Sequence, residues 1–194
     1  KPTLLLHACC APCSSYTLAY LSPHFRQIDV FFYNPNISPA SEYETRLAEL
    51  KRLTDTAPYD CPITVIAGRY DPERFYEMAR GLEELPEGDR RCYLCYEMRL
   101  AETAGMARDG GYDYFTTTLS ISPYKNAAWL NEIGTRAAAQ IGGVYLTSDF
   151  KKRGGYQQSI ALSRKYGLYR QDFCGCVFSK RDAEKRRSER MNTK

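Results

Sequence analysis

The sequence predicts an α/β fold with a parallel sheet of five strands and helices on its flanks. Short apolar runs alternate with longer segments of helical periodicity, as they do in chains of β–α–β units. The 194 residues are 43% hydrophobic and 26% charged, and no repeat, low-complexity segment or linker divides them. A chain of this length buries enough surface to fold without a disulfide scaffold. We therefore expect one Rossmann-like domain.

Five apolar runs mark the strands in chain order: Thr3–His7, Ile28–Tyr33, Ile63–Ala67, Tyr112–Thr118 and Val144–Thr147. In parallel sheets, ligands bind beyond the carboxyl ends of the strands, so the loops that follow the strands form the expected functional edge. These loops are residues 7–14, 33–39, 117–126 and 148–153. Cys61 precedes the third strand, and we expect it on the opposite edge as a buried structural thiol.

Capping signals and apolar spacing predict the helices. Ser41 followed by Glu44 is a capping box that opens one helix, and Asp71 before Pro72 places a cap and a first-turn proline at another. Gly142-Gly143 ends a third. Apolar residues at helical spacing line the first and third of these helices: Tyr43, Leu47, Leu50 and Leu53, and Leu130, Ile133, Ala137 and Ile141.

Seven cysteines in three clusters are expected to converge on the functional edge: Cys9, Cys10, Cys13, Cys92, Cys95, Cys174 and Cys176. Cytoplasmic thiols stay reduced, so clustered cysteines there more often bind metal or carry out redox chemistry. Four thiolates suffice for an iron–sulfur cluster or a structural zinc ion. The cysteines beyond these four indicate a second metal or a redox-active dithiol beside the first site.

The spacing within each cluster carries further information. Cys92 and Cys95 should begin a helix, which places both sulfurs on one face near the positive helix terminus. The adjacent pair Cys9-Cys10 is unusual for zinc. A disulfide across the single residue of Cys174-Gly175-Cys176 would be strained and easily reduced, which suits electron relay.

Other residues narrow the chemistry. With only two histidines, a histidine-based site is nearly excluded, and His7 is either a satisfied core residue or a group that orients the cysteine loop. No phosphate-binding glycine loop follows the first strand, which argues against nucleotide-driven chemistry. Lys125 and Asp149 lie in edge loops as proton donors or phosphate contacts.

Basic and aromatic residues suggest a nucleic-acid partner. The net charge is +4, and residues 180–194 hold seven basic side chains against three acidic ones, so the preceding residues are neutral overall. This tail and the cluster Lys151-Lys152-Arg153 either contact phosphates or are simply solvated. Tyrosines beside Asn34, Asn36 and Ser38 are suited to stacking on an extruded base, or else pack in the core. We divide the chain into a metal-binding catalytic domain, residues 1–180, and a basic tail, residues 181–194.

No apolar run approaches the ~20 residues of a membrane span, and no signal peptide precedes the first strand. We therefore expect a cytoplasmic protein with no membrane partner.

Several motifs, in order from about residue 4 to 180, resemble those of the QueH-type epoxyqueuosine reductases. They are Leu5–Cys13, Phe32–Ile37, Glu42-Tyr43-x-x-Arg46, Cys92-x-x-Cys95-Tyr96-x-x-Arg99-Leu100, Ser122–Asn126 and Asp172–Cys176. The resemblance implies the last step of queuosine synthesis in tRNA, in which the epoxide oxygen at the anticodon wobble position leaves as water. It also implies a fold like that of the adenine-nucleotide α-hydrolases, with a cysteine loop in place of the phosphate loop.

The resemblance further implies cofactors and site residues. Cys9, Cys10, Cys92 and Cys95 match the cysteines expected to hold a [4Fe–4S] cluster. Cys174 and Cys176 match a redox-active pair or ligands of a second, mononuclear iron, and Cys13 could serve the same iron. No flavin or nicotinamide motif is visible, so a ferredoxin- or flavodoxin-like donor must supply electrons. The expected substrate-binding residues are Tyr33, Asn34, Asn36, Ser38, Tyr43, Arg46, Tyr124, Asn126, Lys151 and Lys152.

Three alternatives stay open at this point. A zinc-stabilised RNA-binding module explains the thiolates and the basic tail but not seven converging cysteines. A thiol–disulfide oxidoreductase needs only Cys92 and Cys95. A tRNA-thiolating relative should require ATP.

Overall fold

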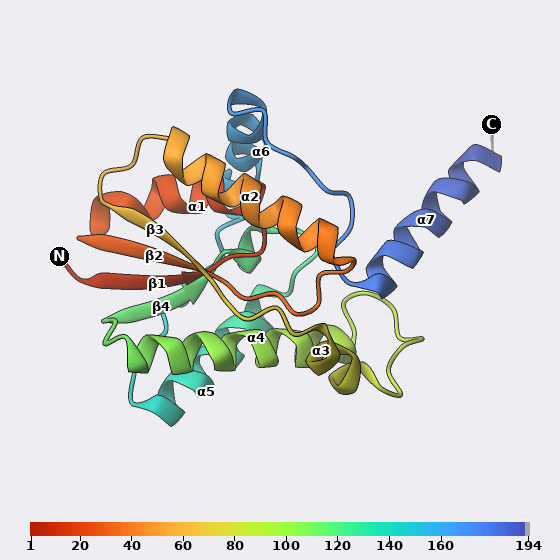
Figure 1. Cartoon of the computed structure of the whole chain (residues 1–194), viewed down its shortest axis with the longest axis horizontal. Coiled ribbons are helices and arrows are strands. Elements are labelled where there is room, and N and C mark those ends of the chain that lie inside the picture. Colours follow the sequence, from red (N-terminus) through yellow and green to blue (C-terminus); the bar gives the residue numbers. More distant parts are fainter. Residues whose placement is uncertain (193–194) are drawn as a thin grey trace.

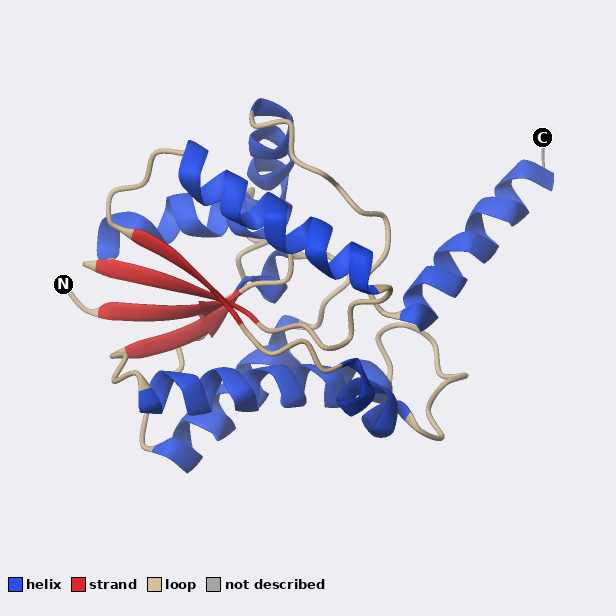
Figure 2. Ribbon diagram, in the orientation of Figure 1, coloured by secondary structure: helices blue, strands red, loops and turns tan. Residues whose placement is uncertain are grey.

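The computed structural model describes residues 1–192 and contains one parallel sheet (Figures 1 and 2). Its four strands lie in the order β3-β2-β1-β4. Their bounds are β1 Thr3–His7, β2 Gln27–Phe32, β3 Ile63–Ala67 and β4 Tyr114–Thr117. All three ladders are parallel, with Leu5 of β1 opposite Asp29 of β2 and Phe115 of β4. The predicted Rossmann-like α/β class is confirmed.

The prediction of a fifth strand at Val144–Thr147 is wrong. One isolated parallel bridge joins Phe115 to Tyr145, with the Phe115 amide donating to Val144 and the Leu146 amide donating to Phe115. Side chains end the pairing there, because Thr116 Oγ1 donates to the Leu146 carbonyl at 2.7 Å. The Ser148 amide then donates to the side chain of Asn131 rather than to a strand.

Helices cover both faces of the sheet (Figure 1). The helices are α1 Ala11–Leu21, α2 Ala40–Thr56, α3 Pro72–Ala79, α4 Arg90–Asp109, α5 Ala127–Ile141, α6 Gly155–Lys165 and α7 Val177–Asn192, with 3₁₀ turns η1 Ser22–His24 and η2 Thr118–Ile121. Helices α1, α2 and α6 lie on one side, and α4 and α5 lie on the other. None of the described helices combines the length and apolar composition that a membrane crossing requires.

The helix termini test the predicted capping signals. The predicted capping box at Ser41 and Glu44 is wrong, because α2 begins at Ala40, directly after Pro39, and no side chain caps it. The Pro39 carbonyl instead accepts from the amides of the first turn. Pro72 does occupy the first turn of α3, while Asp71 pairs with Arg69 rather than capping. Gly142 ends α5 in the left-handed conformation, as its sequence predicts.

Helices α2 and α5 bury the apolar faces that the sequence predicts for them. Leu50 and Leu53 of α2 are fully buried, as are Leu130 and Ile133 of α5. Cys61 is buried before β3, at the amino edge of the sheet, as predicted. Only the first part of α7 packs on the body, and the rest projects from it (Figure 1). Helix α7 contains most of the predicted tail, whose residues 193–194 lie outside the described residues.

Candidate metal centre and adjoining cavity

The carboxyl edge of the sheet is held together by His7, the last residue of β1. Its Nε2 donates to the Tyr33 carbonyl at 3.0 Å, and its Nδ1 accepts from Thr117 Oγ1 at 2.9 Å. Burial, together with the nearby charge of Arg99, lowers the pKa of His7 to about 4. His7 is therefore a neutral, fully bonded core residue that fixes the ends of β1, β2 and β4 relative to one another.

The loop between β1 and α1 and the first turn of α1 bring three thiols together. The sulfur atoms of Cys9, Cys10 and Cys13 all lie within 4.8 Å of one another, which is close enough to share a metal ion. Hydrogen bonds from Cys13 and Cys9 lower the pKa of Cys10 well below its usual value. The pKa of Cys13 is raised, chiefly by its bond to Cys10. Cys10 is therefore the most acidic thiol of this group.

A second group of thiols surrounds a small void next to the first. Cys92 and Cys95 come from the first two turns of α4, and Cys174 and Cys176 come from the segment that leads into α7. The Gly88 amide donates to Cys92 Sγ at 3.3 Å. Burial raises the pKa of Cys95 to about 12, so a metal ion would have to displace its proton.

Four cationic side chains, all more than nine-tenths buried, surround the thiols: Arg46, Arg91, Arg99 and Lys125. Arg46 donates to the Cys174 carbonyl at 2.9 Å and pairs with Glu42. Arg99 donates to the Cys95 carbonyl and to Asn34 Oδ1. Its Nη2 atom has no hydrogen-bond partner although it is buried, and neither has Asn36 Oδ1. Both residues line the small void.

This donor set fits an anionic metal–thiolate group. A cluster held by thiolates carries net negative charge, which is costly to bury without nearby cations. Arg99 supplies such a charge with a free N–H in the wall of the small void, beside Cys92, Cys95, Cys174 and Cys176. The residues therefore fit an iron–sulfur or similar metal centre, while the kind of metal stays a proposal.

Lys125 lies between this centre and a larger cavity. Its Nζ donates to Cys174 Sγ at 2.9 Å and lies 3.6 Å from Glu87. Burial by itself lowers the pKa of Lys125, but the negative charges of Cys174 and of other neighbours raise it well above its ordinary value. Lys125 and Cys174 line both cavities. The ammonium group is thus held against the sulfur at the junction.

The larger cavity has a volume of about 570 Å³ and opens beside the cysteines. The residues that line it include Cys9, Cys13, Tyr124, Tyr156 and Gln171. This volume is in the range of small-molecule sites. Thiols and an ammonium group therefore face a space that a substrate group can enter.

Most of the other residues expected at the site make contacts within the protein and line neither cavity. Asn34 donates to the Ala8 carbonyl, Tyr43 to the Gly68 carbonyl, and Asn126 caps α5. Tyr33 accepts from Arg74, and the Ser38 amide donates to Gly175. Asp149 pairs with Lys151 and Lys152, and none of these three lines either cavity.

Sequence reasoning missed the arginines as part of the centre. Arg99 lies one helical turn after Cys95, so the i,i+4 spacing on α4 could have revealed it. Arg170, Arg186 and Arg187 also line the larger cavity. No local pattern could show this, because their position depends on how α7 packs.

The comparisons with known proteins agree with this arrangement. A family model described as "Epoxyqueuosine reductase QueH" matches residues 4–182. The chain belongs to the QueH family. Proteins named epoxyqueuosine reductase QueH from Staphylococcus epidermidis and Streptococcus pyogenes are 43% and 41% identical to it, each over 92% of this chain and over 76% and 71% of their own lengths. The namesake from Thermotoga maritima is 37% identical over 96% of this chain and 95% of its own length.

Membership of the QueH family confirms the predicted resemblance and the prediction of an oxidoreductase. All seven clustered cysteines and all four buried cations lie within the matched residues. The match ends at residue 182, so the projecting part of α7 lies beyond it.

Proposed function

We propose that this chain reduces epoxyqueuosine at the wobble position of tRNA to queuosine. The reaction takes two electrons and two protons, breaks both carbon–oxygen bonds of the epoxide, and yields an alkene and water. One observation carries the proposal: seven thiols gather at one sheet edge, and three of them, Cys9, Cys13 and Cys174, line a cavity large enough for a modified base. The relatives' printed names give the substrate.

For the cofactors, we assign Cys9, Cys10, Cys92 and Cys95 to a [4Fe–4S] cluster. Cys13, Cys174 and Cys176 remain for a second iron or, as Cys174 and Cys176, for a redox pair. Cys13 and Cys174 lie in the wall of the larger cavity together with Cys9, where a second site would face substrate, whereas Cys176 lines only the small void. Bound iron would supply electrons and a Lewis acid for the epoxide oxygen.

The chain's own residues position and shield the reacting groups. Arg46 holds the backbone carbonyls of Phe173 and Cys174, which fixes the Cys174 thiol at the cavity wall. Lys125 keeps its ammonium group 2.9 Å from the same sulfur, within reach of a ligand in the cavity. Tyr124 and Tyr156 offer aromatic faces on which a base can stack.

The partners follow from the same reaction. The substrate is a tRNA with a queuosine-type anticodon, and a ferredoxin- or flavodoxin-like protein supplies the electrons. Because reduced thiols and tRNA modification both belong to the cytoplasm, we place the protein there.

Anaerobic purification with metal and sulfide analysis tests the proposal. We expect a brown protein with about four iron and four sulfide per chain, plus surplus iron, that converts epoxyqueuosine in tRNA when given a low-potential donor. Cys95→Ser should lose most of the iron and the activity, whereas Cys61→Ser, another buried thiol on the opposite edge, should keep both. A colourless protein that holds only zinc, even after reconstitution, would overturn the iron–sulfur mechanism and favour an RNA-binding module.

A further inference from the structure

Helix α7 turns one basic face towards the larger cavity. Ala183, Arg186 and Arg187 all line it, and their i, i+3, i+4 spacing places them on one side of the helix. Arg170, from the segment between α6 and α7, lines the same cavity. Three arginines therefore line the same cavity as Cys9, Cys13 and Cys174.

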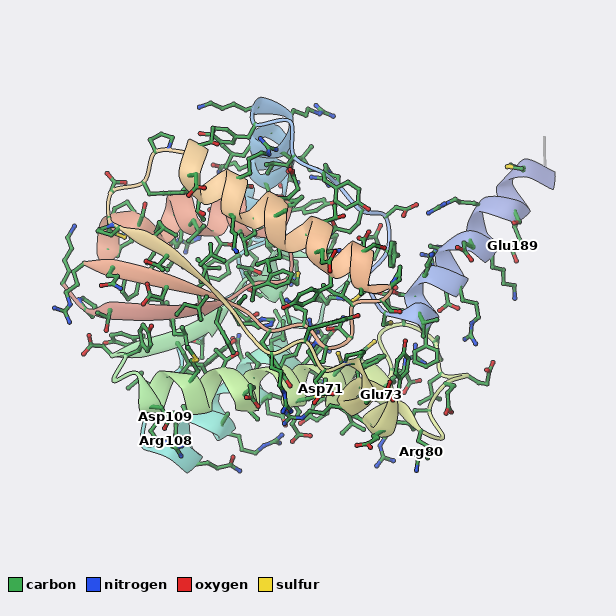
Figure 3. All side chains as sticks on the ribbon, viewed as in Figure 1. Asp71, Glu73, Arg80, Arg108, Asp109 and Glu189 are labelled. Carbon is green, nitrogen blue, oxygen red and sulfur yellow. The ribbon has the colours of Figure 1, made fainter. Side chains whose placement is uncertain are left out.

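The two arginines on this face, Arg186 and Arg187, are exposed to solvent. Ala183 is the last buried residue of α7 among those whose side chains are described. Figure 3 shows α7 with Glu189 far out on the projecting part, away from the sheet. Arg181, on another side of the helix, anchors it by pairing with Glu84. The helix is thus fixed at its beginning, before the two arginines that face the cavity.

Arg187 pairs with a carboxylate that an RNA phosphate could replace. Arg187 pairs with Asp172, and the two side chains are 58% and 60% exposed. An ion pair so open to water contributes little, and a phosphate can replace the carboxylate at small cost. Arg186 has no ion-pair partner among the described residues.

The other basic cluster, Lys151-Lys152-Arg153, is arranged differently. Lys151 Nζ lies 2.6 Å from Asp149 and Lys152 Nζ lies 3.5 Å from the same carboxylate, so one acid serves two lysines. None of the three lines the larger cavity. The cluster therefore lacks the position needed to grip an RNA whose base occupies that cavity.

We propose that Arg186 and Arg187 of α7, with Arg170, bind the sugar–phosphate backbone of the RNA on either side of the nucleotide that enters the cavity. This inference rests on the proposed function, which places an extruded base there. Guanidinium groups match phosphate geometry through paired N–H donors. Tyr124, which is 77% exposed at the cavity mouth, adds a stacking surface beside them.

A charge-matched comparison tests the proposal. The double variants Arg186→Gln/Arg187→Gln and Lys151→Gln/Lys152→Gln remove the same charge from the two clusters. Binding of a fluorescent anticodon stem–loop RNA that lacks the epoxide is followed by anisotropy over a range of salt concentrations. We expect the α7 variant to bind at least about tenfold more weakly and its salt dependence to fall by about one to two phosphate contacts. The lysine variant should change affinity less than about twofold.

Asp172→Asn provides a test in the opposite direction. Removing this carboxylate frees Arg187 and takes a negative charge from the cavity rim, so RNA affinity should rise severalfold. Equal or smaller weakening in the α7 variant than in the lysine variant, with no gain from Asp172→Asn, would overturn the proposal. Circular dichroism and iron content of each variant show whether a loss of affinity reflects unfolding.

The outcome is separable from that of the proposed function. The binding assay uses neither an epoxide nor an electron donor, so it reports on the α7 surface alone. If the wild-type protein binds the stem–loop through α7 but never reduces epoxyqueuosine, the proposed function fails and the RNA surface stands. If reduction proceeds and KM for tRNA is the same in the α7 variant as in the wild type, the surface proposal fails alone.

Discussion

Arginines lie both beside the cysteine centre and on α7, but those at the centre are buried and those on α7 are exposed. Arg99 is 1% exposed, and its contacts are to the Cys95 carbonyl and Asn34, which belong to the walls of the centre. Arg186 and Arg187 are exposed on a helix that leaves the body of the protein. Burying a cation costs folding free energy unless an anion lies beside it. An exposed cation keeps its hydration, and salt screens its charge. The inner arginines therefore suit the anionic metal centre that we propose, and the outer ones suit the transient RNA contact that we propose.

Helix α2 repeats this contrast within one element. Arg46 and Arg52 each pair with a glutamate on the same helix and each donate to backbone carbonyls of the chain between α6 and α7. Arg46 is almost fully buried, while the Arg52 side chain is 43% exposed. The two residues share chemistry and differ mainly in burial, which makes them a matched pair.

The largest effect should come from Arg99→Met, which removes the inner cation while keeping an apolar stem. We expect iron affinity to fall by at least about tenfold, with reductase activity falling alongside it. The metal-free protein should change in free energy of unfolding by less than about 2 kcal/mol, because lost hydrogen bonds are offset by relief of a buried charge. Iron titration followed by absorption, and urea unfolding of the metal-free protein, measure the two quantities.

Arg99→Lys is the control for this prediction, because it keeps the charge without the forked donors. Iron affinity between those of the wild type and Arg99→Met is the expected result. Wild-type iron content in Arg99→Met would mean that the cofactor's charge is balanced elsewhere.

A smaller effect is expected from Arg46→Gln. It removes the donors to Cys174 and Phe173 and leaves the partly buried Glu42 unpaired, so stability should fall by about 2 kcal/mol. Amide hydrogen exchange near Cys174 should rise as well. Arg52→Gln should leave both quantities almost unchanged, and an equal loss in the two variants would show that burial is not what separates them.

The smallest effect concerns an exposed carboxylate at the other edge of the sheet. Hydrogen bonds from the Thr3 amide and hydroxyl lower the pKa of Asp113 below its usual 3.8. A lowered folded-state pKa stabilises the fold above 3.8, and this stability is lost as the pH falls through the lower value. Asp113→Asn should therefore have a slightly lower Tm at neutral pH and approach the wild-type Tm in strong acid. A constant difference across this range would show that the charge plays no part.

The sequence predicted correctly those strands and helix ends that depend only on neighbouring residues. Thr3–His7 and Ile63–Ala67 have their predicted bounds as strands, and Gly142 ends α5, because apolar runs and a left-handed turn are written in neighbouring residues. Val144–Thr147 looks like a strand from its composition, but its pairing is limited to a bridge with Phe115, because the Thr116 side chain bonds the Leu146 carbonyl and the Asn131 side chain bonds the Ser148 amide. That competition depends on residues far along the chain.

The candidate site shows the same limit. Cysteine spacing and strand order predicted that the thiols would converge, and residues as distant as Cys13 and Cys174 do share a cavity wall. Of the four cations that surround them, Lys125 and Arg46 were expected at the site in other roles. Arg91 and Arg99 were not predicted, since a buried arginine and a solvated one look alike in sequence. Arg186 and Arg187 were recognised only as part of a charged tail, because the packing of α7 decides which way they face.

Cys61 lies apart from the other thiols, so its rate of alkylation can serve as a reference for theirs. It lies beyond the amino ends of the strands, apart from the seven other thiols, and burial raises its pKa, so alkylating reagents reach it slowly. Mass spectrometry of partly alkylated protein can therefore measure the rates of two separate events in one experiment. Labelling at Cys95 or Cys174 would record loss of the metal that we propose there, and labelling at Cys61 would record opening of the fold itself.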